Sequence, residues 1–131
     1  MIKDCILTTN QPGFFRDVMD GDVKVATIKA KTKMDMIELE QRAETKDFDA
    51  DGKLVFNRNL GMYTFIRVRQ ALTGHEKCGW ELADENGELL PITEEIIDVI
   101  PKKYFSLIAT AVLTHDSTWD DKKNKEDISK N

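Results

Sequence analysis

Residues 101–113 constrain the fold most strongly, because they have the pattern of a helix with one broad apolar face. The apolar residues in this stretch are Tyr104, Phe105, Leu107, Ile108, Ala111, Val112 and Leu113. Side chains three and four residues apart lie on the same side of a helix, so these residues form a wide stripe. Pro101 fits the first helical position, where its missing N–H is not needed. We therefore predict a helix whose broad face is buried.

A second helix is predicted over residues 33–45. Thr32 can cap its start, and Asp35, three residues on, completes a variant of the capping box. The apolar side chains near one side are Met34, Ile37 and Leu39. The pattern is typical of a helix with one buried side and one solvated side.

Residues 60–72 allow two interpretations. Tyr63 and Phe65 have high strand propensity, but apolar and long side chains also recur at helical spacing. Asn59 can cap the start of a helix, and Gly74 can supply a left-handed stop. Because this segment is long for a strand, we predict a helix.

The remaining elements are shorter. Alternation over residues 22–33 predicts a strand with lysines on its solvated side, and residues 54–56 predict another short strand. Asn86-Gly87 between apolar runs predicts a hairpin turn, and Thr93 caps a short helix that extends to Val99. The predicted fold class is α+β, with a small antiparallel sheet or hairpins, about four helices and a disordered C-terminal tail.

The composition changes after Thr114, and this change sets the predicted domain boundary. We expect one globular domain over residues 1–114 and a polar, flexible tail over residues 115–131, which has few apolar residues to bury. Trp119 lies in that tail, where it either docks onto a partner or contacts the last helix; both readings stay open. We name five candidate partner contacts: Trp119, Phe14, Phe15, Met62 and Tyr104. For Phe14 and Phe15, pinning the N-terminal arm to the domain is the preferred alternative.

Composition excludes several classes of protein. The 131 residues carry 24 Asp and Glu against 19 Lys and Arg, and this surplus of acid argues against nucleic-acid binding. The sequence contains no apolar run of membrane-spanning length. The first residues lack the features of a signal peptide, so we expect a non-secreted protein. Cys5 and Cys78 fit no metal-binding spacing and are predicted to be free thiols.

One short motif suggests a metal site. Asp47, Asp49 and Asp51 alternate before Gly52, as in the opening of a calcium-binding EF-hand loop. The position that should supply a bidentate glutamate is Arg58. The favoured alternative is a turn whose aspartates hydrogen-bond to their own backbone, so calcium stays a weak candidate and no cofactor is expected.

Motifs for catalysis are not found in the sequence. The nucleophile elbow, the phosphate-binding loop and the dinucleotide fingerprint are all missing. His75 and His115 are far apart, and Glu94 and Glu95 fit the first turn of a helix better than an acid–base pair. We expect a protein that is not an enzyme.

The order of elements over residues 22–113 resembles small proteins of tailed bacteriophages and prophages, above all tail assembly chaperones. The resemblance is carried by residues 71–74, 79–95 and 100–101. Together they contain a Gly-Trp pair, a short strand, an Asp-Glu-Asn-Gly turn, Leu-Pro, Thr-Glu-Glu, a helix and a proline before the last helix. Residues 75–78 are an insertion in this pattern.

The resemblance implies a non-enzymatic role in the cytoplasm of the bacterial host. Tail assembly chaperones bind the tape measure protein and help to recruit tail tube subunits. One alternative is a phage protein retained in the particle, such as a connector, completion or decoration protein. Another is a small acidic inhibitor of a host nucleic-acid enzyme, which would gather its carboxylates on one face. The oligomeric state stays open.

Overall fold

The computed structural model describes the backbone of residues 1–129 and the side chains of residues 1–121. The chain forms η1 (Thr8–Asn10), β1 (Phe15–Asp20), β2 (Val23–Lys29), α1 (Lys33–Ala43), β3 (Glu44–Phe48), β4 (Leu54–Arg58), α2 (Leu60–Leu72), β5 (Gly79–Trp80), α3 (Glu94–Val99) and α4 (Lys102–Ser129). Among the described residues these elements make an α+β fold of four α-helices, one three-stranded sheet and one two-stranded sheet, as predicted.

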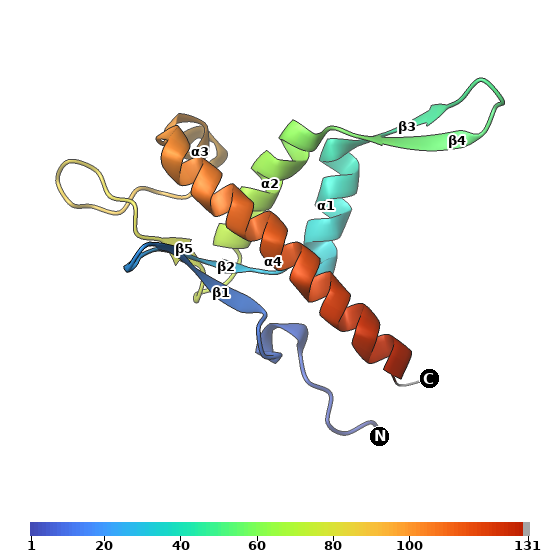
Figure 1. The fold of residues 1–131 in the computed structure, drawn as a ribbon, viewed down its shortest axis with the longest axis horizontal. Helices are drawn as coiled ribbons and strands as arrows, with labels where there is room; N and C mark the ends of the chain where they lie inside the picture. Colours follow the sequence, from blue (N-terminus) through green and yellow to red (C-terminus); the bar gives the residue numbers. More distant parts are fainter. Residues whose placement is uncertain (130–131) are drawn as a thin grey trace.

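The three-stranded sheet is antiparallel and has the order β1-β2-β5. The β1–β2 connection turns at Gly21, whose φ of 62° is easily adopted only by glycine. Val18 pairs with Ala26 and Met19 pairs with Lys24, so β2 carries an extra residue in the form of a bulge. The long helix α4 crosses the molecule beside β1 and β2 and also contacts α2 (Figure 1).

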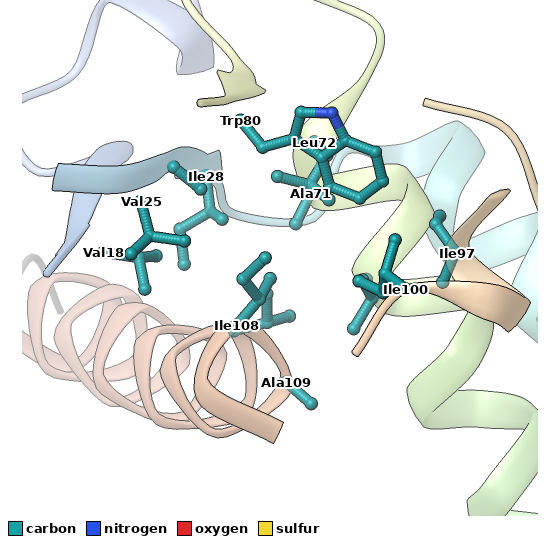
Figure 2. Packing of buried hydrophobic residues seen from close by; sticks show 13 residues of the cluster. Val18, Val25, Ile28, Ala71, Leu72, Trp80, Ile97, Ile100, Ile108 and Ala109 are labelled. Carbon is teal, nitrogen blue, oxygen red and sulfur yellow. The ribbon is translucent and has the colours of Figure 1, made fainter. Parts of the chain in front are cut away.

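The main core lies where the sheet, α2, α3 and α4 meet (Figure 2). Ile28, Leu72 and Ile108 are fully or almost fully buried there. Each such side chain contributes about 1.5–3 kcal/mol by leaving water. Trp80 packs in the same core, and its indole N–H donates to the carbonyl oxygen of Leu90 at 2.9 Å, which satisfies its polar atom. The predicted buried face of residues 101–113 is present in part: Ile108 and Val112 are buried, Tyr104, Phe105, Leu107 and Ala111 are half-buried, and Leu113 is exposed.

The helices α1 and α2 begin where their caps predict. The Thr32 hydroxyl accepts from the Asp35 amide, and the Asp35 carboxylate accepts from the Thr32 amide, which completes the capping box. Asn59 caps α2 through the amide of Met62, and Gly74 follows it with a φ of 86°. The helical interpretation of residues 60–72 is confirmed. Residues 44–45, predicted as the end of the first of these helices, belong instead to β3.

The other short elements agree with the predicted ones in part. Thr93 caps α3 as predicted. Ala83 bridges Leu89 across the Asn86-Gly87 turn, so the predicted hairpin is present but is much shorter than its flanking residues suggest. The strand predicted over residues 22–33 ends at Lys29. The strands β1 and β3 were not predicted.

The predicted domain boundary at residue 114 is wrong, because α4 continues through it without a break. His115, Asp116 and Trp119 are buried. Trp119 packs against Phe14 with ring centroids 5.5 Å apart, beside Ala30. Of the predicted flexible tail, residues 115–121 are thus part of the folded domain. Residues 130–131 lie outside the described residues, as do the side chains from 122 onward.

Candidate interaction surface

The hairpin β3–β4 carries an apolar patch on one of its faces. The two strands pair antiparallel, with Lys46 opposite Phe56 and Phe48 opposite Leu54. Directly opposed residues project from the same face, and successive residues alternate between faces. One face of the hairpin therefore carries Glu44, Lys46, Phe48, Leu54, Phe56 and Arg58. We call Phe48, Leu54 and Phe56 the hairpin patch.

The hairpin patch faces solvent. Phe48 is 72% exposed, Phe56 60% and Leu54 50%. The hairpin itself projects beyond the ends of α1 and α2, so no part of the described core covers it (Figure 1). Single exposed apolar residues are ordinary, but neighbouring aromatic and aliphatic side chains at a protruding tip form a candidate interaction site.

The base of the hairpin is firmly attached, in contrast to its tip. The Asn59 amide donates to the Ala43 carbonyl at 2.8 Å where α1 ends and α2 begins. Arg58 pairs with Glu44 at 3.1 Å, and its guanidinium lies 4.4 Å from the centroid of the Tyr63 ring. An isolated two-stranded hairpin is marginally stable in water, so this anchored base is what holds the hairpin in a defined direction.

A groove continues the hairpin patch toward α1. It has a volume of about 670 Å³ and is lined by Glu40, Gln41, Glu44, Lys46 and Phe56. Met36 and Ile37 are exposed one turn earlier on the same helix. The groove thus places polar side chains of α1 between the hairpin patch and the exposed Met36 and Ile37.

The predicted partner contacts lie apart from this surface. Trp119 and Phe14 belong to the small core that closes α4 against the N-terminal segment, so neither is open to a partner. For Phe14 this agrees with the preferred prediction that it pins the N-terminal arm. Phe15 is half-buried and stacks edge-on against Phe14 at 5.0 Å, which agrees with its pinning role. Tyr104 is half-buried against the main core. Met62 is 40% exposed and is the only one of the five on the open surface.

The aspartates of the predicted calcium motif are spread over β3 and the following turn. Asp47 lies within β3, opposite Val55. Asp49 accepts hydrogen bonds from the amides of Asp51 and Lys53, both at 2.9 Å, as expected for an aspartate that caps its own turn. Among the described residues, no group of three His, Cys, Asp or Glu side chains could hold a metal ion. The geometry supports the turn and not the calcium site.

Shifted pKa values occur in ion pairs that hold the fold together. Burial alone would raise the pKa of Asp35, but hydrogen bonds from Lys29 and Thr32 bring it below its ordinary value. Glu94 accepts from Arg42 at 2.8 Å, and this hydrogen bond lowers the pKa of Glu94. These carboxylates join α1 to β2 and to α3.

Acidic and basic side chains are mixed over the described surface. Lys24 pairs with Asp17, Lys103 with Asp20, and Arg42 with both Glu38 and Glu94.

Comparison with known families, characterised proteins and solved structures finds no match. None of the helices in the described residues is both long and apolar enough to cross a membrane.

Proposed function

We propose that this chain is a non-enzymatic binding protein of tailed-phage assembly, acting as a tail assembly chaperone through its β3–β4 hairpin. The observation that carries the proposal is the hairpin patch, in which Phe48, Leu54 and Phe56 are at least half exposed on one face. The proposed partners are the tape measure protein and, through it, the tail tube protein. The resemblance of residues 22–113 to these chaperones supplies the names of the partners.

The hairpin patch suits an apolar, elongated partner. Aromatic anchors contribute most where they are centred in an interface and sealed by a less critical rim. Here the apolar side chains are flanked by Lys46, Glu44 and Arg58, which would form such a rim. The adjoining groove toward α1 extends the contact in one direction, so an amphipathic helix laid along it would bury one apolar face.

Two alternatives make different demands. A protein retained in the particle would remain with purified virions, whereas a chaperone leaves before the tail is complete. An acidic inhibitor would need its carboxylates gathered on one face, and the mixed ion pairs of this surface give that alternative no support.

The test is co-expression with fragments of a tape measure protein, the proposed partner, scored by the soluble fraction of the fragment. We expect the wild-type chain to keep the fragment soluble. The double variant Phe48→Ser with Phe56→Ser should lose this effect, because the aromatic anchors are removed without altering the core.

The matched control is Val99→Ser, which removes an apolar side chain that is as exposed as Phe48 but lies on α3. This control should protect the fragment like the wild type. Equal protection by the hairpin double variant would contradict the assignment of the site. Recovery of the chain in stoichiometric amounts from purified particles would contradict the chaperone role and support a structural protein retained in the particle.

A further inference from the structure

The strand β1 lies at the edge of its sheet. The order β1-β2-β5 gives it a neighbouring strand on one side only within the described residues. An edge strand presents unpaired backbone N–H and C=O groups that can pair with another extended segment. What lies beside this edge therefore decides whether such a segment can bind.

A groove separates β1 from α4. It has a volume of about 490 Å³ and is lined by residues 16–20 of β1 and by Lys103, Ser106, Leu107, Thr110, Ala111 and Thr114 of α4. Lys103 pairs with Asp20 at 3.2 Å, and His115 hydrogen-bonds to the Phe14 carbonyl at 2.9 Å, so strand and helix run in opposite directions. An edge strand beside a helix, with an apolar groove between them, is an arrangement that accepts a peptide as an added strand.

The charges of the groove select what it binds. Asp20 is neutralised by Lys103, and Asp17 by Lys24 at 3.7 Å. Arg16 is exposed, and among the described side chains it forms no ion pair. Val18, two residues along, lines the groove and is itself only 3% exposed, so Leu107 and Ala111 of α4 supply the more open apolar lining beside it. A matching segment needs a carboxylate opposite Arg16 and an apolar side chain two residues away.

The N-terminal arm of the chain, residues 1–7, has this pattern. It forms no helix or strand and extends away from the sheet (Figure 1). Ile2 is 91% exposed and Ile6 64% exposed, and they flank Asp4 at alternate positions. With Asp4 opposite Arg16, the residue opposite Val18 is Ile6 if the arm runs parallel to β1 and Ile2 if it runs antiparallel. Apolar side chains left open to this degree gain by burial in a groove.

We infer that residues 1–7 of one copy add as a strand to β1 of a second copy, with Asp4 beside Arg16 and an isoleucine between Val18 and Leu107. Each copy then offers one arm and one groove, so the association is head-to-tail and continues from copy to copy. Asp4 has a φ of 64° in the free arm and must become extended on docking, which adds an ordering cost and keeps the association reversible.

The first test is charge reversal, measured by sedimentation velocity over a range of concentrations. Asp4→Lys and Arg16→Glu should each weaken self-association about fivefold or more, because each places like charges together. The double variant Asp4→Lys with Arg16→Glu should restore it. Thermal unfolding of each variant verifies that the fold is intact. A double variant no better than the single ones would overturn the inference.

The second test uses complementary defects. A chain lacking residues 1–7 keeps the groove, and Arg16→Glu with Leu107→Glu keeps the arm but loses the groove. Neither should self-associate, yet a mixture should form a one-to-one complex that grows no further. A mixture that stays monomeric contradicts the inference. So does an arm that protects the β1 amides of its own chain from hydrogen exchange at concentrations too low for self-association.

Failure of this inference leaves the proposed function untouched, because the two sites are separate. The hairpin double variant Phe48→Ser with Phe56→Ser should self-associate like the wild type. If it does not, the second copy binds at the hairpin patch, and the docking of the arm is wrong.

Discussion

Arg67 of α2 and Asp116 of α4 form a two-point ion pair inside the protein. The guanidinium Nε lies 2.7 Å from one carboxylate oxygen and its Nη2 lies 2.8 Å from the other. Arg67 is fully buried, and it also donates to the Lys29 carbonyl at 3.1 Å and to Gln70 at 3.2 Å. A single side chain thus ties α2 to β2 and α4.

Breaking this pair should be costly. Asp116→Asn is expected to lower the free energy of unfolding by about 3–5 kcal/mol, because the Arg67 charge stays buried without its partner. The double variant Arg67→Met with Asp116→Leu should recover part of that loss, since no charge is then buried. Urea unfolding measures both. A double variant less stable than Asp116→Asn would show that the hydrogen bonds to Lys29 and Gln70 matter more than the charge.

Trp119→Ala should destabilise the protein by about 3–5 kcal/mol, the range for a large aromatic removed from a core. The side chain is 7% exposed and packs against Phe14. Ser117→Ala, on an exposed position of the same helix, is the control and should change the stability little. If both variants unfold at the same temperature as the wild type, this part of α4 does not contribute to the core.

Stability should fall as the pH drops below about 6.5, because of His115. Burial lowers the pKa of His115 from its ordinary value of 6.5, and it outweighs the hydrogen bond to Phe14, which favours the charged ring. The unfolded chain therefore takes up a proton at a higher pH than the folded chain. The stabilisation is complete above the unfolded pKa and is lost as the pH falls toward the folded pKa.

The measurement is the free energy of unfolding of His115→Gln against pH. Glutamine can still donate to the Phe14 carbonyl but cannot titrate, so its profile below about pH 6.5 should be flatter than that of the wild type. His75→Gln is the matched control for the loss of a histidine, because the chain has two histidines. A wild-type slope in His115→Gln would place the acid sensitivity elsewhere.

Asp35 has two roles, and both should appear in its variants. It caps α1, and it pairs with the buried Lys29 at 2.5 Å. Asp35→Ala should cost about 3 kcal/mol, which exceeds the usual cost of a lost cap. Adding Lys29→Met should recover the part of the lost stability that exceeds the cost of the cap, because no unpaired lysine is then buried. Chemical unfolding of the single and double variants separates the two terms, and equal stability of the two would contradict the role of the ion pair.

The hairpin patch should make little contribution to stability. Phe48→Ser is expected to change the free energy of unfolding by less than about 0.5 kcal/mol, because its ring is mostly in water already. Ile66→Ala, at a fully buried position between α1 and α2, should cost about 2–5 kcal/mol. A large loss for Phe48→Ser would mean that the patch is covered in solution by another part of the chain.

Local signals account for the elements that were predicted. Each capping signal lies within one turn of the helix that it starts. Helix starts in the structure are marked in this way by Thr32 with Asp35, by Asn59, by Thr93 and by Pro101. The turn residues Gly74 and Gly87 have the positive φ values that glycine favours. Such features depend on neighbours in sequence, so they require no knowledge of the tertiary fold.

The missing parts depend on distant partners. His115 and Asp116 make residues 115–121 appear too polar to pack, but their partners are Phe14 and Arg67, remote in sequence and supplied only by the fold. For the same reason the sequence leaves Trp119 open between a partner and the last helix, and does not indicate its contact with Phe14. Conversely, Phe48 and Phe56 resemble core residues in the sequence, and only the direction in which the hairpin projects leaves them in solvent.

The contact between His115 and Phe14 also determines when this protein can finish folding. The two residues are 101 positions apart, and the small core that they share includes Trp119. Contacts between remote positions slow folding, because a long loop must close before any of them forms. During synthesis the segment around Phe14 emerges first and must wait for α4. Until then its aromatic surface is open to aggregation or to capture by a cellular chaperone.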